Sequence, residues 1–401
     1  IRKERLSGWK KISFYKSDKE NRMCPPKIVF THTSRLDQDG YPESCPFNTR
    51  RAGAVFERIK GMGILTGPGV DVCRPDPLTR RELEWFHDPV YLDALQSLSQ
   101  GSDVTSKAVS MGLGTPDCPI FPGMFEFSCL AGGGSLTAAR MLLDGSAFRA
   151  FNPSGGFHHA GRSTAAGFCY INDVVLALIA LSQNNGRTAF LDVDAHHCNG
   201  VQEAFYHRDD VLTISLHESG RYLFPGTGFE SETGQGPGRG FTVNVPLPVG
   251  TCDDVYTEAL EEIVWPALTA YKPDIIVVEM GMDALAGDPL ADLRLTNNVH
   301  ADLLKRVVDM GKPVLMVGGG GYNFEQTVRG WALCWSVLAE KDFYESGMGM
   351  GGVMLENTEW VGGLRDRRVV PDVSRRKEIR SEVLRVISNL KKAIFPVLGL
   401  R

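Results

Sequence analysis

The segment "RTAFLDVDAHHCNG" (187–200) joins the pattern of a buried strand to a cluster of side chains that bind metals. Its first half is almost continuously apolar, which is typical of a strand in a parallel sheet covered on both faces. Asp192, Asp194 and His196 follow at i, i+2 spacings, so an extended chain would place their side chains on one side. Functional sites of such sheets lie at the carboxyl ends of the strands. The segment therefore predicts an α/β fold with a site at these ends.

Other apolar runs predict further strands of the same sheet. They are residues 27–32, 149–153, 211–217, 241–247, 274–280 and 312–319. Helical periodicity between several of them, as in 172–183 and 255–271, favours helices on both faces of a largely parallel sheet. Several runs also end in polar stretches such as "FNPSGGFHH", "VEMGMD" and "VGGGGY". We therefore expect one α/β domain with a single site.

The composition excludes several classes of protein. The chain has 401 residues, 43% of them hydrophobic and 23% charged, and a net charge of −5. This balance predicts no direct binding to nucleic acid or to a membrane, and no apolar run has transmembrane length. Nine cysteines without a CxxC pair are typical of reduced thiols in the cytoplasm, or in the nucleus of a eukaryote.

The ends of the chain differ from its middle. We expect a polar N-terminal arm (1–25), a main domain (26–355) and a charged helical C-terminal extension (356–401) that packs on the domain. The glycine-rich stretch 131–140 lacks the preceding strand that a phosphate-binding loop requires, so we expect close helix packing there.

A metal site is the strongest prediction from the strand ends. Asp194 and His196 can reach one ion, and Asp283 in "GMDALAGDP" (281–289) is the natural remote partner. Two carboxylates and one imidazole suit a divalent ion, most often Zn²⁺, and three protein ligands leave a position open for water and substrate. Fe²⁺ would also suit this oxygen-rich set. Each of the two motifs, taken alone, also has a simpler interpretation, because an Asp at a strand end commonly caps the following helix.

Seven motifs occur in an order that indicates a known family. They are "GLGTPDCP" (112–119), "GGFHHA" (155–160), "GFCYIND" (167–173), "LDVDAHHCNG" (191–200), "SLH" with "LFPGTG" (215–228), "GMDALAGDP" (281–289) and "GGGGYN" (318–323). Over residues 27–340 the chain resembles the zinc-dependent histone deacetylases, which include bacterial deacetylase-like and acetoin-utilisation proteins. The resemblance implies the arginase/deacetylase fold, a central eight-stranded, mainly parallel sheet flanked by helices on both faces. It makes 26–355 a deacetylase catalytic domain.

The resemblance also implies two ion sites. The ligands of one catalytic Zn²⁺ are Asp194, His196 and Asp283. A structural K⁺ is surrounded by the side chains or backbone of Asp192, Asp194, His196, Ser215 and Leu216.

The adjacent histidines of "GGFHHAGR" (155–162) are then an acid/base pair rather than ligands. Two carboxylate ligands nearly neutralise a divalent ion, so the ion acidifies water less and an added base is useful. The family pattern pairs His158 with Asp192 and His159 with Asn199. Because an amide stabilises an imidazolium less than a carboxylate does, we expect His159 to keep a lowered pKa and to act as the neutral base.

The resemblance assigns further residues to the oxyanion and to the acyl chain. Tyr322 follows four glycines that let the backbone approach the site, and its hydroxyl would donate to the oxyanion of the reaction. Without the other motifs, Tyr322 would be read as a buried tyrosine at a helix start. Gly167, Phe168 and Phe224 match the walls of a narrow acyl-lysine channel, although single phenylalanines are core residues in most proteins.

The last predicted positions concern specificity and departures from the family pattern. Asp117 matches a rim carboxylate that anchors the substrate backbone, and Arg51 would line an acetate-release channel. Leu290 stands where polyamine-specific relatives carry an acidic residue, which favours acyl-lysine. Phe157 replaces a common Trp, and Cys198 replaces a glycine. If φ at 198 is positive, the Cβ costs roughly 1 kcal/mol; otherwise the turn is reshaped.

These residues predict a metal-dependent deacetylase that hydrolyses N-ε-acetyl-lysine in a protein or peptide to lysine and acetate. A deacetylase of small acetylated amines or polyamines uses the same centre and is the second hypothesis. A non-catalytic acyl-lysine-binding scaffold would not need the complete set of ligands, base and tyrosine. A ureohydrolase fits the fold class but expects a more carboxylate-rich site with two metals. Assembly into a homo-oligomer is left open by the sequence.

Overall fold

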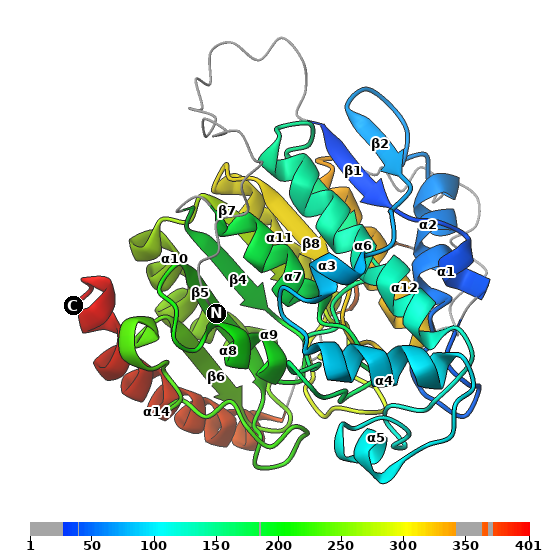
Figure 1. Ribbon diagram of the computed structural model, residues 1–401. Coiled ribbons are helices and arrows are strands. Elements are labelled where there is room, and N and C mark those ends of the chain that lie inside the picture. Colours follow the sequence, from blue (N-terminus) through cyan, green and yellow to red (C-terminus); the bar gives the residue numbers. More distant parts are fainter. Residues whose placement is uncertain (1–26, 39, 184–185, 342–362, 368–371) are drawn as a thin grey trace.

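The computed structural model describes residues 27–38, 40–183, 186–341, 363–367 and 372–401 (Figure 1). Its centre is an eight-stranded sheet with the strand order β2-β1-β3-β8-β7-β4-β5-β6, in which every neighbouring pair is parallel. The strands are β1 Ile28–Thr31, β2 Val70–Cys73, β3 Arg149–Asn152, β4 Thr188–Asp192, β5 Val211–Glu218, β6 Thr242–Leu247, β7 Ile275–Glu279 and β8 Val314–Val317. The predicted α/β class is confirmed.

All seven strands predicted from apolar runs are present, each within the predicted range or one residue beyond it. The strand that the sequence did not indicate is β2, Val70–Cys73. Among the described strands it pairs with β1 alone, at the edge of the sheet, and its second and third residues are exposed. A short, half-exposed edge strand has no continuous apolar run, which explains why the pattern missed it.

Helices cover both faces of the sheet. They are α1 Arg35–Gln38, α2 Arg51–Gly61, α3 Arg80–Leu83, α4 Pro89–Ser99, α5 Ser106–Ser110, α6 Met124–Leu143, α7 Asp173–Leu181, α8 Asn199–Phe205, α9 Asp253–Ala259, α10 Trp265–Tyr271, α11 Asn297–Asp309, α12 Phe324–Leu338 and α14 Val373–Leu398. A π-helical turn, η3 Leu260–Val264, joins α9 to α10. The predicted helix 255–271 is therefore present, but its hydrogen-bond pattern changes from α to π and back to α.

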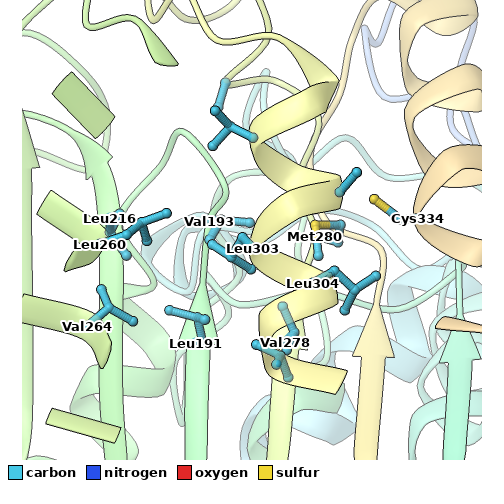
Figure 2. Packing of buried hydrophobic residues seen from close by; sticks show 14 of the residues in the cluster. Leu191, Val193, Leu216, Leu260, Val264, Val278, Met280, Leu303, Leu304 and Cys334 are labelled. Atoms are coloured by element: carbon cyan, nitrogen blue, oxygen red, sulfur yellow. The ribbon is translucent and has the colours of Figure 1, made fainter. Parts of the chain in front are cut away.

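Alternate residues of each strand belong to opposite hydrophobic layers. Leu191 and Val278 contribute to the layer formed with α2, α9 to α12 and α14. Phe190 and Val277, one residue earlier in the same strands, contribute to the layer formed with α4, α6, α7 and α8. Figure 2 shows Leu191 and Val278 in the first layer together with Leu303 of α11. This two-sided burial is what the near-continuous apolar strands predict.

The glycine-rich stretch 131–140 lies inside helix α6, as expected. A Cβ at Gly133 would come within 1.9 Å of the carbonyl oxygen of Asp76, so a glycine is required where the chain crosses the helix. The stretch is a packing surface and not a phosphate-binding loop.

The C-terminal helix α14 packs against β6, α9, η3 and α10 (Figure 1). Both predicted boundaries of the main domain, at residues 25 and 355, fall outside the described residues. Among the helices that the structure describes, none is long and apolar enough to span a bilayer.

Candidate metal centre and active site

The three predicted metal ligands meet at the carboxyl ends of β4 and β7. Nδ1 of His196 lies 3.2 Å from Oδ1 of Asp194 and 2.9 Å from Oδ2 of Asp283, and all three side chains are buried. The chain is extended only as far as Asp192; residues 194–196 form a bend. The expectation of one extended segment was therefore wrong in detail, and it is the bend, with the remote Asp283, that gathers the ligands.

Glycines make room for the two carboxylates. A Cβ at Gly320 would lie 2.1 Å from Oδ2 of Asp283, and a Cβ at Gly281 would lie 2.2 Å from Oδ2 of Asp194. The amide of Gly320 also donates to Oδ2 of Asp194 at 2.6 Å. The site is thus a cradle that any larger side chain at these positions would fill.

The charges of the cluster suit a divalent cation. Burial alone would raise the pKa of Asp194, but the nearby His158 and His196 hold it well below its usual range. Burial and the charge of Asp194 raise the pKa of Asp283 to about 7. Burial lowers the pKa of His196, yet hydrogen bonds to both carboxylates raise it to about 10. Both carboxylates contact the same imidazole nitrogen. Two carboxylates and one imidazole are also the ligands that a divalent ion prefers, so such an ion would balance their charge.

The paired histidines are both buried and lie beside this cluster. Nδ1 of His158 is 2.8 Å from Oδ2 of Asp192, and Nδ1 of His159 is 2.7 Å from Oδ1 of Asn199. The two Nε2 atoms are 3.1 Å apart. Each imidazole is therefore oriented through its Nδ1, and both Nε2 atoms face the same region.

The surroundings of the two histidines give them opposite pKa shifts. Burial, followed by the charges of His158 and His196, lowers the pKa of His159 well below its usual value. Burial also acts to lower the pKa of His158, but the carboxylates of Glu279 and Asp192 raise it well above its usual value. The expected lowering of the pKa of His159 is thus found, but burial and the neighbouring histidines cause it; the hydrogen bond to Asn199 acts weakly in the opposite direction.

Backbone contacts fix the turn that carries the histidines. The buried carboxylate of Asp173 accepts hydrogen bonds from the amides of Gly156 and Phe157. The side chain of Asn172 donates to the carbonyl of His158 at 3.2 Å. The first residues of α7 therefore hold in place the turn that carries His158 and His159.

Tyr322 is placed by two charged side chains. Oδ2 of Asp288 accepts the amide N–H of Tyr322 at 2.7 Å. The buried guanidinium of Arg51 donates to the carbonyls of Gly321, at 2.6 Å, and Gly319, at 3.1 Å. Arg51 therefore clamps the glycine loop, whereas its predicted role in an acetate channel stays a prediction.

The predicted aromatic walls flank the histidines and the tyrosine. The ring centroid of Phe224 is 5.0 Å from that of His159, and the centroid of Phe168 is 5.6 Å from that of Tyr322. Phe224 is 45% exposed, so it reaches the surface beside a buried base. Phe168 has a φ of 66°, the left-handed conformation that side chains rarely adopt.

Asp117 supports this strained turn. Its Oδ2 accepts the amide of Gly167 at 2.8 Å, and its carbonyl accepts the amide of Phe168 at 3.0 Å. A Cβ at Gly167 would lie 2.4 Å from the ring of His159, so the wall and the base are in contact there. Asp117 thus holds the turn that carries Phe168, whereas its predicted contact with a substrate stays a prediction.

The remaining predicted residues lie close to the centre. Asp192 and Ser215 are register neighbours on β4 and β5, and Leu216 follows on β5, so the residues predicted to surround K⁺ are adjacent. Leu290 is half-buried, and its amide donates to Oδ1 of Asp288 at 2.9 Å. The loop that carries Leu290 is therefore tied to Tyr322 through one carboxylate.

The two departures from the family pattern cause no backbone strain. Cys198 has a φ of −75° and precedes α8, so the alternative of a strained left-handed residue is wrong. Burial raises the pKa of its thiol well above the usual value, which keeps it protonated. Phe157 is buried, with its ring centroid 5.8 Å from that of Phe47.

Three buried acids near the centre were missed as site residues: Asp173, Asp288 and Glu279. Asp173 and Asp288 lie in the motifs "GFCYIND" and "GMDALAGDP", but both act through backbone amides, which the motifs do not identify as partners. For Glu279 the signal was a charged residue near the end of the apolar run "DIIVVEM" (274–280). Its Oε1 lies 3.0 Å from Nδ1 of His158.

Comparison with known proteins gives consistent matches. A family model described as "Histone deacetylase domain" matches residues 45–338. Histone deacetylase 8 of Danio rerio is 37% identical over 289 residues, which is 72% of this chain and 75% of that protein. The acetoin utilization protein AcuC of Bacillus subtilis is 36% identical over 314 residues, or 77% and 81% of the two chains. The crystal structure of an HDAC homolog from Aquifex aeolicus superposes with a TM-score of 0.79 at 29% identity, covering 90% of this chain and 100% of that one.

Proposed function

The chain belongs to the histone deacetylase family, and from this premise we propose that it hydrolyses N-ε-acetyl-lysine in proteins or peptides to lysine and acetate. Deacetylase activity follows from the family; the lysine side chain as substrate is our proposal. One observation supports it above others. The rings of five residues lie close together at the carboxyl ends of β4 and β7: the proposed base His159, the proposed ligand His196, Tyr322, Phe168 and Phe224.

The ligand cluster would hold a divalent ion, which we propose to be Zn²⁺. Asp194, His196 and Asp283 supply the two carboxylates and one imidazole that suit such an ion. When bound, it supplies Lewis-acid chemistry that polarises the acetyl carbonyl and favours deprotonation of water.

Proton transfer falls to the histidines. Asn199 orients His159, and the lowered pKa favours its neutral form, so its Nε2 can take the proton of the attacking water. His158 lies 3.1 Å away through its own Nε2 and can return a proton to the departing amine. The pair thus supplies both the base and the acid of an amide hydrolysis.

Tyr322 stabilises the charge that develops on the carbonyl oxygen. Its ring lies with a centroid 6.4 Å from that of His196, beside the ligand cluster. Donation from its hydroxyl stabilises the oxyanion more than the neutral carbonyl, which lowers the barrier. The loop contacts of Asp288 and Arg51 keep this donor in place.

A small acetylated amine is the second candidate substrate, since one relative bears the name acetoin utilization protein. Leu290 offers no charge to a cationic polyamine, which favours the acyl-lysine. To distinguish the two substrate classes, kcat/KM is measured for acetyl-lysine peptides, acetylpolyamines and longer acyl-lysines, with and without a chelator. Turnover of acetylpolyamines alone would contradict the proposal.

The same preparation distinguishes this centre from a two-metal ureohydrolase site. We expect one transition ion per chain after loading with Zn²⁺, measured by elemental analysis. Two ions per chain, together with turnover of a guanidinium substrate, would contradict the assignment.

A further inference from the structure

Glu279 is a buried carboxylate at the centre of the site to which the mechanism above gives no task. It ends β7 and is the register neighbour of Asp192, which ends β4. Its Oε1 lies 3.0 Å from Nδ1 of His158, and Oδ2 of Asp192 lies 2.8 Å from the same nitrogen. Two carboxylates from adjacent strands thus flank one ring nitrogen.

This arrangement is costly for the fold. Both side chains are fully buried, and burial raises the pKa of Glu279 well above its usual value because a buried carboxylate loses its hydration. Both oxygens of Glu279 are without a hydrogen-bond partner among the described residues, because the aligned acceptor for Nδ1 of His158 is Asp192. A buried polar atom without a partner is rare and is found where a site needs it. The group that compensates Glu279 is the ring of His158.

We propose that Glu279 is a positioning residue that, together with Asp192, keeps the proton of His158 on Nδ1. Nε2 of His158, which faces Nε2 of His159 at 3.1 Å, is then the nitrogen left to exchange protons in the reaction. Asp192 fixes the direction of the ring, and Glu279 places a second carboxyl oxygen on the same side, 3.0 Å from Nδ1. The inference rests on the proposed function, because it assumes that His158 moves a proton.

A positioning role and a purely structural role of Glu279 predict different changes in melting temperature and in kcat. Gln at 279 keeps the shape and an oxygen that carries partial negative charge, whereas Leu keeps the approximate volume and offers no acceptor. Glu279 makes no aligned hydrogen bond, and Asp192 still accepts from His158 when Glu279 is replaced, so the substitution leaves no new buried group unpaired. Glu279→Gln should therefore leave the melting temperature unchanged or raised. A structural role would instead predict a lower melting temperature with kcat per folded molecule unchanged.

The test compares Glu279→Gln, Glu279→Leu and the matched control Thr188→Val in the zinc-loaded full chain. Thr188 is buried at the opposite end of β4, and its hydroxyl also finds no partner within the part of the chain that the structure describes. With an acetyl-lysine peptide we expect kcat to fall about ten-fold in Glu279→Leu and about three-fold in Glu279→Gln, with KM and zinc content within about two-fold of wild type. Thr188→Val should match the wild type.

Two outcomes would overturn the proposal. One is a kcat of Glu279→Leu within two-fold of the wild type. The other is a loss in both variants that appears only as KM, zinc content or folded fraction.

A spectroscopic measurement keeps the inference testable if Glu279→Leu does not fold. Nitrogen-15 NMR of the ring should show a proton on Nδ1 of His158 in the wild type, and its resonance should shift in Glu279→Gln but not in Thr188→Val. An unshifted resonance would show that Glu279 does not act on His158. Because this readout needs no turnover, it separates failure of this inference from failure of the proposed deacetylase reaction.

Discussion

At position 199 this chain presents an amide to the proposed base, with Oδ1 of Asn199 2.7 Å from Nδ1 of His159. Asn199→Asp would place a carboxylate there, which stabilises the imidazolium and raises the pKa of His159. His159 must be neutral to accept a proton. A raised pKa therefore means that activity is lost at a higher pH as the solution is acidified.

We expect the acidic limb of kcat/KM against pH to move upward in Asn199→Asp. The basic limb, which depends on other groups, serves as the internal control. Superposable profiles for wild type and variant would show that His159 is not the base that sets this limb.

A second prediction at the residue scale concerns the oxyanion donor. Tyr322→Phe removes the hydroxyl and keeps the ring that packs near Phe168 and His196. We expect kcat to fall by a factor on the order of 10²–10³, the usual cost of one oxyanion donor. Zinc content should stay at the wild-type value because the hydroxyl is not a ligand; an unchanged kcat would remove the assigned role.

At the scale of elements, the strand-end loops decide whether the ligands can meet. Gly320 lies in the loop after β8, where a Cβ would come within 2.1 Å of Oδ2 of Asp283 and 2.9 Å of Oδ2 of Asp194. We predict that Gly320→Ala displaces at least one carboxylate and weakens zinc binding by about ten-fold or more, as competition with a metal-binding dye would show.

Gly61, in the last turn of α2, is the control for this substitution. A Cβ there would meet no atom within 4 Å. Gly61→Ala should leave zinc affinity unchanged and, through helix propensity, raise stability by up to about 1 kcal/mol. If Gly320→Ala bound zinc as tightly as Gly61→Ala does, the carboxylates would not depend on the glycine cradle.

The elements also show where sequence patterns stop being informative. Strands β4 and β7 were predictable because both faces are buried, which leaves an uninterrupted apolar run. Edge strand β2 was not predictable, because two of its four residues are exposed. The bend at 194–196 was not predictable either, since it depends on Asp283, which accepts the amide of Ala195 at 2.8 Å.

At the scale of the whole molecule, α14 is a long helix whose apolar side packs against the layer next to β6. Leu390 is fully buried in it. Leu390→Ala should lower the free energy of unfolding by about 2–5 kcal/mol, since it removes buried methyl groups and leaves a cavity. Because the residue lies outside the site, kcat of the folded enzyme should not change.

Leu384, on the same helix, is 39% exposed and provides the comparison. Leu384→Ala should change the free energy of unfolding by less than about 1 kcal/mol in denaturant titrations. Equal losses in the two variants would mean that α14 is not docked through its buried side.

The sequence by itself determined the α/β class and seven of the strands, because burial periodicity is a property of short segments. The clustering of Asp194, His196 and Asp283 and the pairing of the histidines with Asp192 and Asn199 were predicted through ordered motifs that resemble a known family, and the structure brings these residues together. The tertiary structure decided the rest.

Only the fold brings Glu279 to His158, Asp288 to the amide of Tyr322 and Arg51 to the glycine loop. Each of these contacts joins residues far apart in the chain, and two of them end on backbone atoms that every residue possesses. No local pattern encodes such contacts; they exist because parallel strands place their carboxyl ends at one edge of the sheet.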